Sequence, residues 1–159
     1  MYKRDDNYLI SKDLFNITER DVNLLDQEVS DGEGWKSYCN GQIIKATVFG
    51  NKISAICYEN FQEYLVEISV NSGEISGRCT CGSYGRICNH IVALLYSWIN
   101  DSDGFMDVGN SLSKLKNKNK DELFELIARM MMKNPQNIFL LNNPDSLDDD
   151  LDDIEGMFN

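Results

Sequence analysis

The sequence has no long apolar segment, which excludes several classes of protein at the outset. No window of its 159 residues contains the roughly 18 uninterrupted apolar residues that a membrane-spanning helix requires. Residues 1–6 are mostly polar or charged and lack the apolar core of a secretory leader. We therefore expect a soluble, cytoplasmic protein that does not associate with a membrane.

Basic residues are also scarce. The chain has 15 Lys and Arg against 26 Asp and Glu, which gives a net charge of -11 and an isoelectric point near 4.4. This balance argues against a broad basic surface for nucleic acid. A local basic patch stays possible, because salt at 0.1 M limits the reach of each charge to about 10 Å.

Motifs of catalysis are missing as well. The chain has no GxxxxGK[ST] phosphate loop, no carboxylate pair and no nucleophile triad. A nucleophilic pair of Cys88 and His90 would need a third group to orient it, and none is evident. We therefore expect that the protein is not an enzyme.

The five cysteines do not form the pattern of a disulfide framework. Their number is odd, and three of them lie within ten residues of one another. The other two, Cys39 and Cys57, stand alone in strand-like sequence. We expect both to be small buried apolar residues.

The first half of the chain predicts one helix followed by a sheet. Thr18 is a suitable N-cap for a helix over 19–29, with Asp21 in the position of a capping box. Residues 35–78 alternate in the manner of strands, with turns at 50–51 and 71–73. This arrangement predicts an antiparallel meander of three or four strands.

The second half predicts helices. An apolar face over 91–98 indicates a helix that ends before the polar residues 100–104. A further helix over about 120–133 ends before Pro135. Its apolar stripe is expected to belong to the core rather than to a partner-binding groove, and consists of Leu123, Phe124, Leu126, Ile127, Met130 and Met131.

The strongest chemical signal is a cluster of metal-ligating residues. Cys79 and Cys81 are followed, after six residues, by Cys88 and His90, which is the single histidine of the chain. Zinc prefers four such ligands in a tetrahedron, and four protein ligands leave no position for a catalytic water. The pattern predicts one structural zinc ion, in preference to a chance cluster of thiols beside a core histidine.

The residues around this cluster resemble a SWIM-type zinc finger of the stand-alone bacterial or archaeal kind. The pattern CxC…CxHxxA runs from Cys79 to Ala93, and the preceding order of Gly32, Gly34 and Tyr38 and of the strands is also similar. The resemblance covers roughly residues 18–98. Many members of the family have Lys where this chain has Asn89, and the change removes a charge that could contact phosphate.

The resemblance implies a role in contacts with proteins or DNA. The SWIM finger occurs in helicase-like ATPases of the Swi/Snf type, in transposases and in partners of recombinase paralogues. We expect an adaptor that binds a helicase-like ATPase or a recombinase-type protein within a DNA-processing complex. The alternative is a finger that binds DNA directly and is regulated by an acidic C-terminal tail.

Several residues near the finger could contact nucleic acid. Arg78 and Arg86 flank the zinc loop, where they could contact phosphates or balance the negative zinc–thiolate centre. Tyr84 could stack on a base, although packing against the protein is the safer prediction. A lysine-rich stretch is either a solvated linker or a phosphate-contacting arm, and it comprises Lys114, Lys116, Lys118 and Lys120.

The segment after Leu141 combines acidic with apolar residues and contains no basic residue. Such a segment can dock into a basic, apolar groove on a partner, or it can be a disordered, solubilising tail. It resembles in composition the acidic tip of bacterial single-stranded-DNA-binding proteins. The candidate contacts within it are Leu151, Ile154, Met157 and Phe158.

Together these observations predict an α+β fold. A small antiparallel β-meander carries a zinc-pinned finger and helix, followed by C-terminal helices and a disordered acidic tail. The expected divisions are an N-terminal arm over 1–17, a zinc-finger domain over 18–100, a helical extension over 101–141 and a flexible tail over 142–159.

Overall fold

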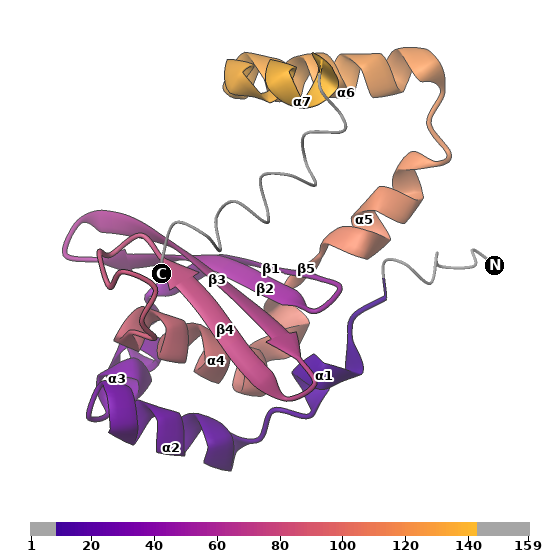
Figure 1. The fold of residues 1–159 in the computed structure, drawn as a ribbon. Coiled ribbons are helices and arrows are strands. Elements are labelled where there is room, and N and C mark those ends of the chain that lie inside the picture. Colours follow the sequence, from indigo (N-terminus) through magenta and orange to yellow (C-terminus); the bar gives the residue numbers. More distant parts are fainter. Residues whose placement is uncertain (1–8, 143–159) are drawn as a thin grey trace. The chain divides into compact units, whose positions relative to one another are not determined.

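The computed structural model describes residues 9–142, so the candidate contacts of the acidic tail lie outside the described residues. The fold is α+β, as predicted (Figure 1). In chain order its elements are α1 (Lys12–Phe15), α2 (Glu19–Val29), α3 (Glu33–Cys39), β1 (Ile43–Phe49), β2 (Lys52–Glu59), β3 (Gln62–Asn71), β4 (Glu74–Cys79), α4 (Asn89–Asp101), η2 (Ser102–Gly104), β5 (Met106–Asp107), α5 (Val108–Leu115), α6 (Lys120–Lys133), η3 (Pro135–Asn137) and α7 (Ile138–Asn142).

The sheet has five strands in the order β4-β3-β2-β1-β5. The first four strands form the predicted antiparallel meander, with tight turns between neighbours. The fifth strand, β5, pairs in parallel with β1 through Met106 and Asp107. The expectation of three or four strands is therefore corrected to five, because a strand of two residues is too short to show alternation in sequence.

One face of the sheet packs against α4, and α2 and α3 pack against α4 from the far side (Figure 1). The helix α4 is therefore enclosed, and every residue from His90 to Trp98 is buried. Alternate residues of the strands, among them Ile53, Val66 and Ile68, point into the same core. This central position of α4 makes its first turn a rigid place to hold a ligand.

A helix replaces strand in the segment just before the sheet. The sequence pattern predicts β structure for residues 35–39, but they belong to α3. The carboxylate of Asp26 accepts hydrogen bonds from the backbone N–H groups of Gly34 and Trp35, each at 3.0 Å, and so caps the N-terminus of α3 from another helix. A cap supplied from α2 leaves no local signal, which explains the wrong prediction.

Residues 9–17, expected to be part of an arm, contribute to the core. Leu14 in α1 is fully buried, and its carbonyl accepts a hydrogen bond of 2.8 Å from Nε1 of Trp98. Cys57 is buried as predicted, and burial raises the pKa of its thiol to about 12. Cys39 is exposed, contrary to prediction, because it ends the helix α3 instead of lying in a strand.

The chain divides into two compact units, one ending at Ser113 and the other beginning at Lys114. The second unit includes α6, whose predicted bounds are confirmed. The prediction that its apolar stripe is core is wrong, since no residue of α6 is buried in the part of the chain that the structure describes. Among residues 9–142, no helix has both the length and the apolar character needed to cross a bilayer.

Candidate metal centre

The first two cysteines lie where β4 gives way to a turn. Cys79 is the last residue of β4, and Cys81 follows after Thr80. The turn is fastened to β3, because the N–H of Thr80 donates to the carbonyl of Leu65 at 3.1 Å and the N–H of Leu65 donates to Oγ1 of Thr80 at 3.0 Å. Gly82 then adopts φ +83°, which reverses the chain at low steric cost.

The other two residues belong to the start of α4. Cys88 is the N-cap, in an extended conformation, and its side chain makes no capping hydrogen bond. His90 follows in the first turn and is 4% exposed. The helix N-terminus carries partial positive charge, which favours the thiolate form of a nearby cysteine.

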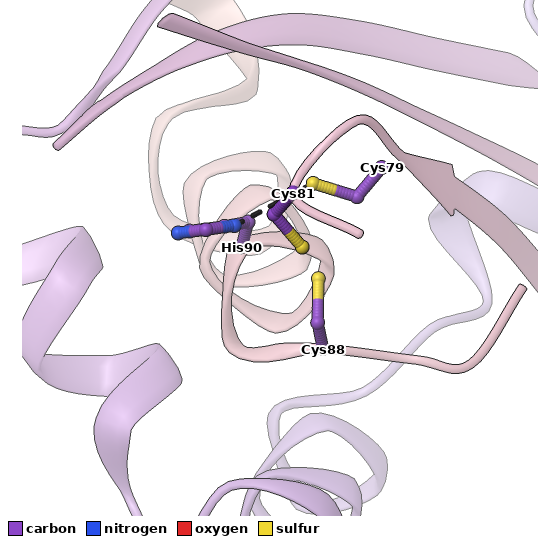
Figure 2. Close-up of side chains that lie close together, drawn as sticks. All are labelled: Cys79, Cys81, Cys88 and His90. Atoms are coloured by element: carbon purple, nitrogen blue, oxygen red, sulfur yellow. Dashed lines mark hydrogen bonds between the residues drawn. The ribbon is translucent and has the colours of Figure 1, made fainter. Parts of the chain in front are cut away.

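These four side chains converge on one point, as Figure 2 shows. One ligand atom from each of Cys79, Cys81, Cys88 and His90 lies within 4.8 Å of all the others. Nδ1 of His90 is 3.5 Å from Sγ of Cys79. Tetrahedral zinc with bonds of about 2.0–2.3 Å places neighbouring ligand atoms roughly 3.5–3.8 Å apart. The cluster therefore needs only a small contraction to close around an ion.

The second nitrogen of His90 is held by a carboxylate. Nε2 of His90 lies 3.0 Å from Oε2 of Glu59 at the end of β2. The ring of Tyr64 stacks on the imidazole with centroids 4.8 Å apart. These contacts orient Nδ1 toward the cysteines, as a carboxylate commonly orients a zinc-binding histidine. Neither Glu59 nor Tyr64 was identified from the sequence, because they lie far from His90 along the chain.

Hydrogen bonds within the cluster shift the pKa values of its members. The hydrogen bond from Cys79, followed by the one from His90, lowers the pKa of Cys88 to about 3, although burial opposes the shift. The hydrogen bond to Cys88, followed by burial, raises the pKa of Cys79 far above its usual range. The hydrogen bond to Cys88 raises the pKa of His90 to about 9, with Glu59 contributing. The metal-free cluster thus has a thiolate at Cys88 and retains protons that a metal must displace.

The donor set fits one structural zinc ion. Three sulfurs and one imidazole nitrogen complete a tetrahedron, so that no position is left for water or substrate. Bound zinc would join the end of β4 to the start of α4. Such a link contributes directly to folding free energy.

The residues flanking the cluster differ in their surroundings. Arg78 forms an ion pair with Glu67 on the neighbouring strand. Tyr84 is 87% exposed, contrary to the prediction that it packs. Arg86 is exposed in the same loop.

A cleft of about 710 Å³ adjoins this loop. It is lined on one side by the end of α2, Ser30 and the start of α3. The other side is formed by the loop over residues 80–88, called the finger loop below, and by Asn89 at the start of α4. Its lining includes Tyr84, Arg86 and Asn89, together with Glu33 from α3. The hydroxyl of Ser83, also in the lining, is buried and has no hydrogen-bond partner among the described residues.

The lysine-rich stretch is not in the unit that holds the finger. Lys114 is in the last turn of α5, Lys120 begins α6, and Lys116 and Lys118 lie between them. All four belong to the second compact unit. Their role in nucleic-acid contact stays a prediction.

Comparison with known proteins agrees with the geometry of the cluster. Residues 64–99 match the family model described as SWIM zinc finger. This segment runs from β3 through α4 and includes all four ligands. A search of curated proteins found no match to the chain. A search of solved structures found none either.

Proposed function

We propose that this chain, which carries a SWIM zinc finger at residues 64–99, is a non-catalytic adaptor. It would bind a protein partner within a DNA-processing complex, and the partner would be a helicase-like ATPase or a recombinase-type protein. The finger itself is a zinc-binding module of a kind that contacts proteins or DNA. The identity of the complex is the part that requires experiment.

The observation that carries this proposal is the closed set of ligands. A catalytic zinc keeps an open position for water, whereas Cys79, Cys81, Cys88 and His90 fill all four positions. A zinc ion in this site would therefore have a structural role, which is to fix the finger loop on the enclosed helix α4. What remains available to partners is the outer surface of that loop.

That surface favours a protein partner over bare DNA. The cleft beside the loop contains both Arg86 and Glu33, so its charge is mixed. Arg78 is already paired with Glu67, and Glu59 lies beside the cluster. Aromatic residues such as the exposed Tyr84 are frequent anchors in protein interfaces.

A comparison of captured proteins tests the adaptor. Immobilised wild-type chain and a Tyr84→Asn variant are incubated with the same lysate, and the bound proteins are quantified by mass spectrometry. Asn tolerates the positive φ of +52° found at residue 84, so the loop conformation is retained. We expect a helicase-like or recombinase-type protein to be captured by the wild type and lost with the variant. Equal capture by both would remove the finger loop from the interface.

Direct DNA binding is the second candidate, since Arg86 and Tyr84 place a cation and an exposed aromatic ring in one loop. Fluorescence anisotropy with labelled single-stranded and duplex DNA, at low and moderate salt, tests this role. Several phosphate contacts would make affinity fall steeply as salt rises. Tight binding that appears only after truncation at Leu141 would indicate a finger restrained by its acidic tail. An absence of binding by both forms supports the adaptor.

A further inference from the structure

The helix α6 has a complete N-terminal cap but no fully buried residue. Asn119 and Glu122 form a capping box at its start, which fixes where the helix begins. The apolar stripe at helical spacing is only partly covered: Leu123, Leu126 and Met131 are half-buried, whereas Phe124 is 74% exposed and Met130 54% exposed. The short helix α7 adds further exposed apolar side chains, namely Ile138, Phe139, Leu140 and Leu141.

A helix of this kind is not expected to stand alone in water. With 14 residues it has the length at which isolated helices are only marginally stable, so most of its stability must come from packing. Leaving the stripe in water also forgoes the stabilisation that burial of its large apolar side chains would provide. The stripe therefore requires a partner surface.

The charges beside the stripe indicate what that surface is. Three of the four charged residues in the first half of α6 are acids, namely Asp121, Glu122 and Glu125, beside Lys120 at its start. The charged residues of its second half are the bases Arg129 and Lys133. Glu122 and Lys133 stand on the same edge of the stripe, because about three full turns separate them. An antiparallel copy of the helix would place Glu122 of each chain near Lys133 of the other.

We propose that α6 is a homodimerisation helix, which packs antiparallel on α6 of a second copy of this chain with Ile127 at the centre. A parallel pair would bring the acidic halves together and is disfavoured by repulsion. The acidic segment after Leu141 is less suited to cover the stripe of α6, because the acids in the first half of the helix would repel it. This inference goes beyond the proposed function and does not depend on it.

The test is the oligomeric state of the full chain, measured by sedimentation velocity over a range of concentrations. The wild type is expected to be a dimer that dissociates on dilution. Ile127→Lys places a charge in the centre of the stripe and is expected to raise the dimer Kd at least tenfold. Met132→Lys is the matched control, since Met132 is 82% exposed and lies on another face of α6. Both variants retain good helix formers, and circular dichroism and zinc content show that the fold persists.

The orientation of the pair is tested through its ion pairs. Glu122→Gln keeps the capping hydrogen bond and removes the charge. Glu122→Gln and Lys133→Gln should each raise the dimer Kd several-fold. The Kd of the double variant should be little higher than that of either single variant. Additive effects would contradict the antiparallel pairing.

Three results would overturn the proposal as a whole. The first is a wild-type chain that stays monomeric at all concentrations. The second is a dimer that Ile127→Lys leaves intact. The third is a dimer that is lost when the chain is truncated after Asn142, because the missing segment would then be the true contact.

Discussion

Oε2 of Glu59 lies 3.0 Å from Nε2 of His90, on the side of the imidazole opposite the cysteines. This carboxylate fixes the ring so that Nδ1 is the nitrogen presented to the metal. Glu59 ends β2 and His90 begins α4, so the contact also joins the sheet to the central helix. The precision of the zinc site thus depends on a residue outside the four ligands.

Glu59→Gln is expected to weaken zinc binding by about 10–100-fold, the usual effect of removing such a partner of a metal-binding histidine. The amide can still accept the hydrogen bond, but it no longer stabilises positive charge on the ring. Competition with a chelator of known affinity measures the change. Glu63→Gln, on the same hairpin, is the control and should bind zinc like the wild type.

Loss of a ligand should remove both the metal and the local fold. We expect Cys88→Ser and His90→Ala to contain little zinc by elemental analysis and to melt at lower temperature, since structural zinc contributes folding free energy. The exposed Cys39 provides the control, because Cys39→Ser changes a thiol outside the cluster. Unchanged zinc content and melting in either ligand variant would disprove the site.

Zinc affinity should rise as the pH rises from neutral through about 9, and it should continue to rise above that pH. The pKa of His90 is raised to about 9 and that of Cys79 lies still higher, so both groups hold protons at neutral pH in the metal-free cluster. Zinc must displace these protons, which makes its binding weaker as pH falls. Calorimetry in buffers of different ionisation enthalpy measures the protons released. Binding without proton release would contradict the prediction.

Gly34→Ala is expected to destabilise the fold by about 1–3 kcal/mol, the usual cost of overpacking. A Cβ at this position would lie 2.4 Å from Cγ1 of Val92, where α3 packs on α4. Urea denaturation measures the change in the free energy of unfolding. Gly104→Ala is the control, because no atom lies within 4 Å of the added carbon there.

Phe61→Gly should stabilise the protein by about 1 kcal/mol. Asn60 and Phe61 are the two central residues of the β2–β3 hairpin, and both have positive φ, which Asn-Gly adopts most readily. The Phe61 ring is 93% exposed, so its removal forfeits little packing. Phe61→Ala keeps a Cβ in the left-handed region and should bring no comparable gain. Equal melting temperatures for the two variants would refute the strain argument.

Much of the site could be predicted from sequence because its signals are local. The spacing of Cys79, Cys81, Cys88 and His90 identifies the ligands without any knowledge of the rest of the fold. The family match covers the same segment. Thr18 caps α2 through Asp21, three residues away, and the capping box is present as predicted. Contacts this short in sequence can be recognised without a structure.

Other features depend on contacts between distant parts of the chain. The cap that Asp26 supplies to α3, the carboxylate of Glu59 on His90 and the pairing of Arg78 with Glu67 each join separate elements. The sequence could not indicate them, because one residue gives no sign of which neighbour folding will bring to it. The same holds for exposure: the stripe of α6 has the period of a core helix, and only the tertiary structure shows that it is open.

The sequence alone thus determined the zinc ligands, the α+β class and the capped start of α2, because each rests on residue type and short spacing. The tertiary structure decided which side chains support the ligands, which basic residues are already paired and which apolar faces remain open. Those properties arise from packing, which is a relation between elements and has no local sequence pattern.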